Sequence, residues 1–306
     1  MSDHANLDLA GKEDPAPKPL FVIGSSRSGT TLLQRILNSF DEVCIWGEHG
    51  GFLKYIARGY YTFQNEIVVR HLDSLKIPTK KDPSTFEKLK NPKIWSAWSN
   101  QFNGEDLKES CRNFIDSLLF VNKPGLKFYG FKEIRYGRRG KGELFRPLGN
   151  PSKDGVLDFL KKIFPESKFI FIIRNPLDSI ASTVSCVKEC DISEAVDIAV
   201  SWAEQNEHLL EFYLKKKKDC FFLKYEDLID KNKTSLADLS SFLGLPLSSK
   251  QYSVLDLESG RGADPDKKNR KNLFTDRVIY RIIKKVKKTA EKFGYYPNKD
   301  YFHGHA

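Results

Sequence analysis

A short apolar run that leads into a glycine-rich loop limits the fold of this chain more than any other feature. Leu20–Ile23 is a stretch of four apolar residues, and Gly24 follows it directly. Such a run predicts a strand that is buried on both faces, as in a parallel sheet. The segment Thr30–Phe40 then carries apolar residues at helical spacing. A strand, a glycine loop and a helix in this order predict an anion site at the carboxyl edge of a parallel sheet.

The loop has the spacing of a P-loop but lacks the lysine of that motif. Gly24 and Gly29 are spaced as in GxxxxGK[ST], and Thr30 stands at the lysine position. Glycines permit the tight turn, while backbone N–H groups and the helix N-terminus favour an anion. Arg27 is the nearest cation, and Thr31 adds a second hydroxyl. Enzymes that use ATP place the lysine, together with Mg²⁺, on the β- and γ-phosphates. The loop therefore favours an anionic ligand that needs less positive charge at this point than the triphosphate of ATP does.

The rest of the chain alternates between strand and helix patterns. Further strands are predicted at Lys127–Lys132, Phe169–Ile173 and Cys220–Leu223. Helices are predicted at Val156–Phe164, from Pro176 onward, at Ser193–Lys216 with Ser193 as the N-cap, at Ser235–Leu243 with Gly244 ending it, and at Ile279–Phe293. The alternation predicts an α/β fold of three layers, α/β/α, with a central and mostly parallel sheet. We expect one domain over residues 19–297, a disordered N-terminal tail at 1–18 and a C-terminal tail at 298–306.

A second anion site is predicted where the strand Phe169–Ile173 ends. Arg174 follows this strand directly, and Ser182 lies about two helical turns further along. A guanidinium and a hydroxyl so placed can face one anion. Two anion sites at two strand ends predict a ligand that carries two separate anionic groups.

These two segments resemble the donor-binding motifs of the sulfotransferases that use 3'-phosphoadenosine 5'-phosphosulfate (PAPS). Residues 27–32 (RSGTTL) are similar to the 5'-phosphosulfate loop, in the form typical of the tyrosylprotein-sulfotransferase-like branch, and residues 172–182 (IIRNPLDSIAS) are similar to the 3'-phosphate motif. The resemblance implies in-line transfer of a sulfuryl group to a hydroxyl or amine, with 3'-phosphoadenosine 5'-phosphate (PAP) as the product and no metal. The donor-binding residues that it implies are Arg27, Ser28, Gly29, Thr30, Thr31, Arg174, Ser182, Tyr225, Arg270 and Lys271.

The same resemblance implies the catalytic groups. Glu48 follows Arg27 at the spacing of the general base, which takes the proton of the acceptor. Partial burial would raise the pKa of this carboxylate. His49 is the rival base, and a surface position for Glu48 is the alternative without function. Lys132 would stabilise charge on the bridging oxygen, a role that Arg27 could share. The alternative for Lys132 is a salt bridge, for example to Glu133.

Composition leaves other functions open. The formal net charge of +10 favours anionic ligands in general. A P-loop kinase using ATP and Mg²⁺ is one alternative, although no second-strand aspartate for Mg²⁺ is evident. A non-enzymatic protein that binds polyanions or membranes through Lys284–Lys288 is another. The five cysteines form no CxxC pattern and the histidines no cluster, which argues against a zinc site.

The acceptor is left open by the sequence. A small metabolite, a glycan and a peptide tyrosine all fit, and the thinly matched segment 50–125 is where we expect acceptor specificity. No signal peptide and no apolar stretch of membrane-spanning length is found, so a cytoplasmic enzyme is expected. We expect no nucleic-acid partner, and a homodimer stays open.

Overall fold

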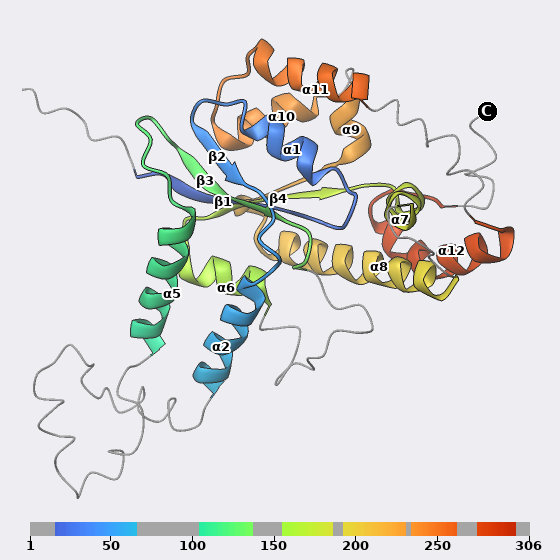
Figure 1. The fold of residues 1–306 in the computed structure, drawn as a ribbon, viewed down its shortest axis with the longest axis horizontal. Helices are drawn as coiled ribbons and strands as arrows, with labels where there is room; N and C mark the ends of the chain where they lie inside the picture. The colour runs from blue at the N-terminus through green and yellow to red at the C-terminus, as the bar shows by residue number, and fades with distance from the viewer. Residues whose placement is uncertain are drawn as a thin grey trace, which may run out of the picture.

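A parallel sheet lies at the centre of this molecule, between two layers of helices (Figure 1). The computed structural model describes residues 16–65, 104–136, 155–185, 192–230, 234–261 and 274–297. Within these ranges the sheet has five strands in the order β2-β3-β1-β4-β5, and every neighbouring pair is parallel. The strands are β1 (Lys18–Gly24), β2 (Val43–Trp46), β3 (Phe128–Glu133), β4 (Lys168–Ile173) and β5 (Cys220–Lys224). The predicted α/β/α class with a parallel sheet is confirmed.

The helices connect the strands and cover both faces of the sheet. They are α1 (Thr30–Leu37), α2 (Leu53–Asn65), α5 (Gly104–Leu119), α6 (Val156–Ile163), α7 (Pro176–Val184), α8 (Ile192–Lys215), α9 (Tyr225–Ile229), α10 (Ser235–Leu243), α11 (Ser249–Arg261) and α12 (Asp276–Lys292), with a 3-10 turn at Lys217–Asp219. One face carries α1, α10 and α11, and the other carries α2, α5, α6 and α8 (Figure 1). Helix α12 packs along α8 and reaches α7.

Side chains of the central strand alternate between the two helical layers. Leu20 and Val22 belong to the core that includes α1 and α10, whereas Phe21 and Ile23 belong to the core that includes α6 and α8. All four are fully buried. This two-sided burial is the reason that the strand reads as an unbroken apolar run, because no face of it meets water.

The central strand β1 and its neighbour β4 end at a topological switch point, because the chain leaves them toward opposite sides of the sheet. From β1 the chain passes through α1 to β2 on one side of the sheet, and from β4 it passes through α7 and α8 to β5 on the other. In sheets of this kind, ligands bind in the crevice outside the carboxyl ends of two such strands. Both predicted anion segments lie at these two strand ends.

Several local predictions are confirmed and others are wrong. Gly244 ends α10 with φ 67°, in the left-handed conformation expected of a C-terminal glycine. The long helix begins at Ile192, so Ser193 lies inside it and its assignment as the N-cap is wrong. Strand β2 and helices α2, α5, α9 and α11 were not predicted. The domain limits stay a prediction.

Within the described ranges, no helix has the length and apolar character needed to cross a bilayer. In the same part of the chain, no three His, Cys, Asp or Glu side chains are grouped as metal ligands.

Candidate active site

The loop from Ser25 to Gly29 is a tight turn that exposes the N-terminus of α1. Arg27 has φ 59° and Gly29 has φ 97°, both in the left-handed region. Ser28 closes the turn, since its backbone N–H and its Oγ both donate to the Ser25 carbonyl, at 3.2 and 2.7 Å. Gly29 caps the helix without a side chain. The first N–H groups of α1 therefore face the loop, as an anion site requires.

Both glycines of the loop are also required by close packing. A Cβ on Gly24 would lie 2.5 Å from Ser28 Oγ and 2.7 Å from the Ile172 carbonyl oxygen. A Cβ on Gly29 would lie 2.3 Å from the ring of Tyr225. The ring of Tyr225 thus packs directly on the loop, at the point where the sequence resemblance had expected a donor contact.

The two predicted anion segments touch each other. Arg27 Nε donates to Ser182 Oγ at 2.9 Å, although 155 residues separate them. Arg174 Nη1 donates to the Arg27 carbonyl at 3.4 Å, and Ser179 Oγ donates to the Ser26 carbonyl at 2.8 Å. The loop after β1 and the first turns of α7 are therefore joined by one set of hydrogen bonds.

Two buried polar atoms at this junction have no hydrogen-bond partner among the described residues. They are Ser25 Oγ and Arg174 Nε. The guanidinium of Arg174 lies 4.6 Å from the ring centroid of Tyr225, which fixes its orientation. Buried donors are rarely left unpaired, and such exceptions often mark a ligand site. Unpaired donors beside a glycine loop fit a ligand with phosphate or sulfate oxygens.

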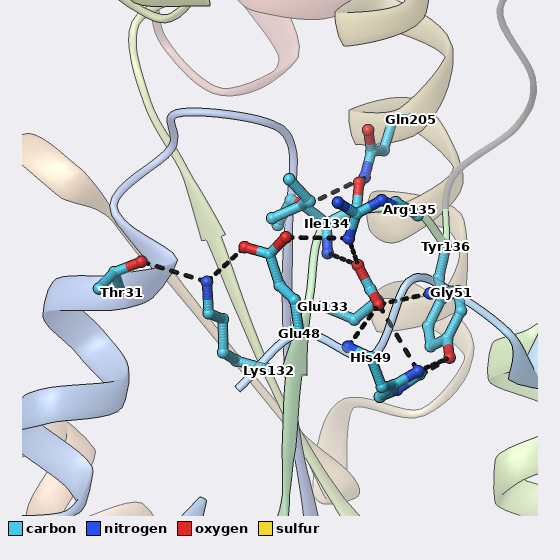
Figure 2. A network of polar contacts seen from close by, with 11 residues as sticks. Thr31, Glu48, His49, Gly51, Lys132, Glu133, Ile134, Arg135, Tyr136 and Gln205 are labelled. Carbon is cyan, nitrogen blue, oxygen red and sulfur yellow. Dashed lines mark hydrogen bonds and ion pairs between the residues drawn. The ribbon is translucent and has the colours of Figure 1, made fainter. Parts of the chain in front are cut away.

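A buried lysine connects the loop to a carboxylate on the neighbouring strand. Lys132, near the end of β3, is only 6% exposed. Its Nζ donates to Thr31 Oγ1 at 3.1 Å and to Glu48 Oε1 (Figure 2). Arg135 Nη1 binds the other oxygen of Glu48 at 2.9 Å. The candidate base and the candidate charge stabiliser are thus in direct contact, next to the loop.

The electrostatic surroundings of Glu48 lower its pKa. Burial alone would raise it, but the hydrogen bond and charge of Lys132, followed by those of Arg135, outweigh that effect. The sequence-based expectation of a raised pKa for this carboxylate is therefore wrong. The carboxylate is therefore ionised near neutral pH and able to accept a proton.

His49 is held away from this contact. Its ring packs edge-on against Phe131 at 4.5 Å and against Phe52 at 5.0 Å. Its Nε2 lies 3.0 Å from the hydroxyl of Tyr136. Phe131 belongs to the core on the α6 and α8 face of the sheet, whereas Lys132, the next residue, points to the α1 face. Burial lowers the pKa of His49, with the charge of Glu133 acting in the opposite direction. The structure places this ring in a packed position rather than beside Thr31.

Most of the predicted site residues are brought together. Those gathered around the ends of β1, β3 and β4 are Arg27, Ser28, Gly29, Thr30, Thr31, Glu48, Lys132, Arg174, Ser182 and Tyr225. Arg270 and Lys271 lie outside the described residues. The assignment of roles to these residues stays a prediction.

Three residues of the site were not foreseen from the sequence. Glu133 and Arg135 bind the segment around Glu48, and Gln205 Nε2 donates to the carbonyls of Gly24 and Ile134 at 3.0 and 2.8 Å (Figure 2). The charged run after Lys132 was a usable signal for the first two. No local sequence pattern identified Gln205, in the middle of the long helix α8, as a residue of the site.

Glu226 joins two distant segments near the site. Its Oε1 accepts from the N–H of Asn175 at 2.8 Å and its Oε2 accepts from the hydroxyl of Tyr295 at 2.5 Å. It therefore fixes the chain just after Arg174 and links it to the segment that follows α12.

The chain is similar in sequence to a family model and to two curated proteins. A family model described as Sulfotransferase family matches residues 19–249. Among curated proteins, Cytosolic sulfotransferase 14 and Cytosolic sulfotransferase 15 of Arabidopsis thaliana are 32% and 30% identical, each over 28% of this chain. These matches span 30% and 28% of the length of those two proteins.

Solved structures to which the chain is similar include the sulfotransferase domain from the Synechococcus PCC 7002 olefin synthase. It has a TM-score of 0.45 and 16% identity, over 78% of each chain. The mouse sulfotransferase SULT7A1 complexed with PAP has a TM-score of 0.39 and 14% identity, over 79% of this chain and 64% of that one.

Proposed function

The chain belongs to the sulfotransferase family, and from this we propose that it transfers a sulfuryl group from PAPS to a hydroxyl or amine of an acceptor. One observation carries the proposal further than family membership. The phosphate loop after β1 and the Arg174–Ser182 segment after β4 meet through the hydrogen bond from Arg27 to Ser182. PAPS carries anionic groups on both the 5' and the 3' side of its ribose, so it needs two such segments side by side.

The donor groups would divide between the two segments. The N–H groups at the start of α1, with Thr30 and Thr31, suit the 5'-phosphosulfate. Arg174 and Ser182 suit the 3'-phosphate, because a guanidinium and a hydroxyl both donate to its oxygens. Tyr225 lies over Gly29 and beside Arg174, where it can contact the nucleotide. Arg270 and Lys271 stay part of the proposal through sequence resemblance alone.

The transfer step is assigned to Glu48 and Lys132. The acceptor oxygen attacks sulfur, its proton passes to the carboxylate of Glu48, and the bond from sulfur to the 5'-phosphate oxygen breaks. The charge left on that oxygen is stabilised by Lys132, with Arg27 as a second cation. Lys132 binds Glu48 in the free protein, so its movement toward the leaving oxygen would raise the pKa of Glu48. The base would then strengthen as the donor is bound.

The proposal also includes the family branch and the cellular location, and it weighs the kinase alternative. The tyrosylprotein-sulfotransferase-like branch is supported by the contact of Glu48 with Lys132, the pair that this branch implies. A cytoplasmic location is supported by the two plant relatives, which are both named as cytosolic sulfotransferases. A kinase is disfavoured because Thr30 stands where a P-loop kinase has the lysine that contacts the β- and γ-phosphates of ATP. The acceptor and a homodimer are not assigned.

PAP formation from PAPS is the experiment that tests the proposal. The purified protein is incubated with PAPS and with separate pools of phenols, sugars and tyrosine peptides, and PAP is quantified by chromatography. We expect acceptor-dependent PAP in at least one pool. Glu48→Gln is expected to reduce it to a small residual rate, while Glu42→Gln, whose carboxylate pairs with Lys127, should leave it unchanged. Equal turnover in Glu48→Gln would move the base elsewhere.

A further inference from the structure

We propose that Glu133 is a positioning residue, which holds the segment carrying Glu48 in the arrangement where that carboxylate meets Lys132 and Arg135 together. The proposal deepens the function above, and it rests on that function only for the role given to Glu48. Glu133 is the last residue of β3, and its side chain is completely buried. Burying a carboxylate costs free energy unless its oxygens accept hydrogen bonds or ion pairs. The partners of Glu133 therefore indicate which part of the chain it positions.

Those partners are backbone donors of the Glu48 segment. Oε2 of Glu133 accepts from the N–H of Gly51 at 2.8 Å and from the N–H of His49 at 3.4 Å. Oε1 accepts from the N–H of Ile134 at 2.8 Å, which fixes the carboxylate against its own strand. One carboxylate thus clamps the chain on the C-terminal side of Glu48 to the end of β3.

The sheet itself does not supply this support. The ladder between β2 and β3 ends with the pair Trp46 and Phe131, two residues before Glu48. Beyond it the segment 47–51 leaves the sheet, and Gly50 and Gly51 have φ of 72° and 69°. Beyond the end of the ladder, the side chain of Glu133 accepts the N–H groups of His49 and Gly51. In a longer strand, backbone carbonyls would accept such N–H groups.

Glu133 also acts on the carboxylate of Glu48 through a shared cation. Arg135 Nη1 binds Glu133 Oε1 at 2.7 Å and Glu48 Oε2 at 2.9 Å (Figure 2). Lys132 binds the other oxygen of Glu48 from the α1 side. The four side chains alternate in charge, two carboxylates and two cations, so the cluster is neutral as a whole. Each oxygen of Glu48 has one cation, which fixes the rotation of the carboxylate.

The same clamp separates His49 from the reacting side. Its Nδ1 lies 3.6 Å from Glu133 Oε2, and its ring is packed against Phe131. Because the backbone of His49 is bound to Glu133, the side chains at 48 and 49 are turned to different partners. The arrangement thus selects Glu48, and not its neighbour, for contact with Lys132.

Amide hydrogen exchange of Glu133→Gln tests the clamp directly and needs no ligand. A glutamine has one acceptor oxygen, and its NH₂ group would face N–H donors. Exchange at His49 and Gly51 is expected to rise by about tenfold or more, while that of β1 and β4 stays within about twofold. Glu166→Gln is the matched control, since it removes a carboxylate paired with Arg112 outside this cluster. Unchanged protection at His49 and Gly51 in a folded Glu133→Gln protein would overturn the proposal.

Kinetics test whether the clamp acts through Glu48. For Glu133→Gln we expect kcat to fall by about 10- to 100-fold, because a displacement of about 1 Å at a catalytic group has effects of this size. The KM for PAPS and the Kd of PAP should change less than about twofold. In a Glu48→Gln background the same change should cost almost nothing further, whereas a general loss of folding quality would lower activity in both backgrounds.

Arg135→Gln covers the case in which Glu133→Gln does not fold. Its side chain is partly exposed, and the substitution leaves the carboxylate of Glu133 and its backbone donors in place. Protection at His49 and Gly51 should be retained and kcat should still fall, because Glu48 loses one of its two cations. Loss of that protection in Arg135→Gln, or an unchanged kcat, would contradict the shared-cation step. Failure of wild-type protein to bind PAP would refute the proposed function, yet the exchange result would still decide the clamp.

Discussion

Replacing Ser182 by alanine should remove selectivity for the 3'-phosphate and leave the rest of the molecule intact. Ser182 is buried on α7, and its Oγ accepts from Arg27 Nε at 2.9 Å. A hydroxyl can accept from Arg27 and donate to a phosphate at the same time. The substitution removes this donor from the 3' side of the nucleotide while the loop amides on the 5' side stay in place.

The size of the effect follows from the chemistry of the lost contact. A hydrogen bond to a charged group contributes about 1.5–3 kcal/mol, which corresponds to a change in Kd of about 10- to 100-fold. PAP, which has the 3'-phosphate, should lose this affinity. Adenosine 5'-phosphate, which lacks it, should keep its Kd within about twofold.

Isothermal titration calorimetry with the two nucleotides measures this difference. Ser185→Ala serves as the control, because it removes a hydroxyl that donates to the Ser182 carbonyl one turn along α7. We expect the control to bind PAP as the wild type does. An equal loss for both nucleotides in Ser182→Ala would point to general damage, and no loss for either would refute the assignment of the 3' site.

Three further predictions concern the reacting groups and the sheet. Lys132→Met should lower kcat by about 10²- to 10³-fold with PAP affinity changed less than tenfold, since PAP lacks the transferred group; Lys127→Met, at an exposed ion pair, is the control in the same kinetic assay. Because the pKa of Glu48 is lowered in the free protein, kcat/KM for PAPS should show no Glu48-dependent step between about pH 6 and 8 and should fall only below about pH 5. A step near neutral pH that disappears in Glu48→Gln would contradict this. Gly130→Ala should destabilise the protein by about 3 kcal/mol or more in urea denaturation, because its Cβ would lie 1.9 Å from a carbonyl oxygen of β1, whereas Gly47→Ala, with open space around it, should cost far less.

The linked pH dependence of stability has a definite sign. A carboxylate whose pKa is lower in the folded than in the unfolded protein stabilises the fold above the unfolded pKa, and that contribution is lost as pH falls through the folded pKa. The deficit of Glu48→Gln relative to wild type, measured by urea denaturation, should therefore shrink as pH is lowered. A deficit that grows toward acid pH would contradict the ion pair with Lys132.

The central strands and the phosphate loop could be predicted because their causes are local. The strands β1 and β4 are buried on both faces, so their composition alone marks them. The loop needs glycines for close approach to Ser28, Ile172 and Tyr225, and these glycines are visible in the sequence. The strand β2 has only four residues and lies at the edge of the sheet, where no comparable apolar run is required.

The active-site contacts depend on pairing between distant segments, which local pattern does not encode. Lys132 was weighed as a partner of Glu133, its neighbour in sequence. Adjacent residues of a strand point to opposite faces, so Lys132 binds Glu48, 84 residues away, and Glu133 binds the backbone of the same segment from the other side. The resemblance indicated which residues matter, but only the register of β2 on β3 shows how they meet.

The thermal stability of the wild-type protein with different nucleotides tests the central claim most directly. PAP at about 100 times its Kd should stabilise the fold by about 2.7 kcal/mol, which raises Tm by roughly 5 °C. A PAPS site predicts this shift with PAP and no metal, and a much smaller shift with ADP or with ATP and Mg²⁺. A larger shift with ATP and Mg²⁺ than with PAP would contradict a PAPS-binding site and favour a kinase-like use of the same loop.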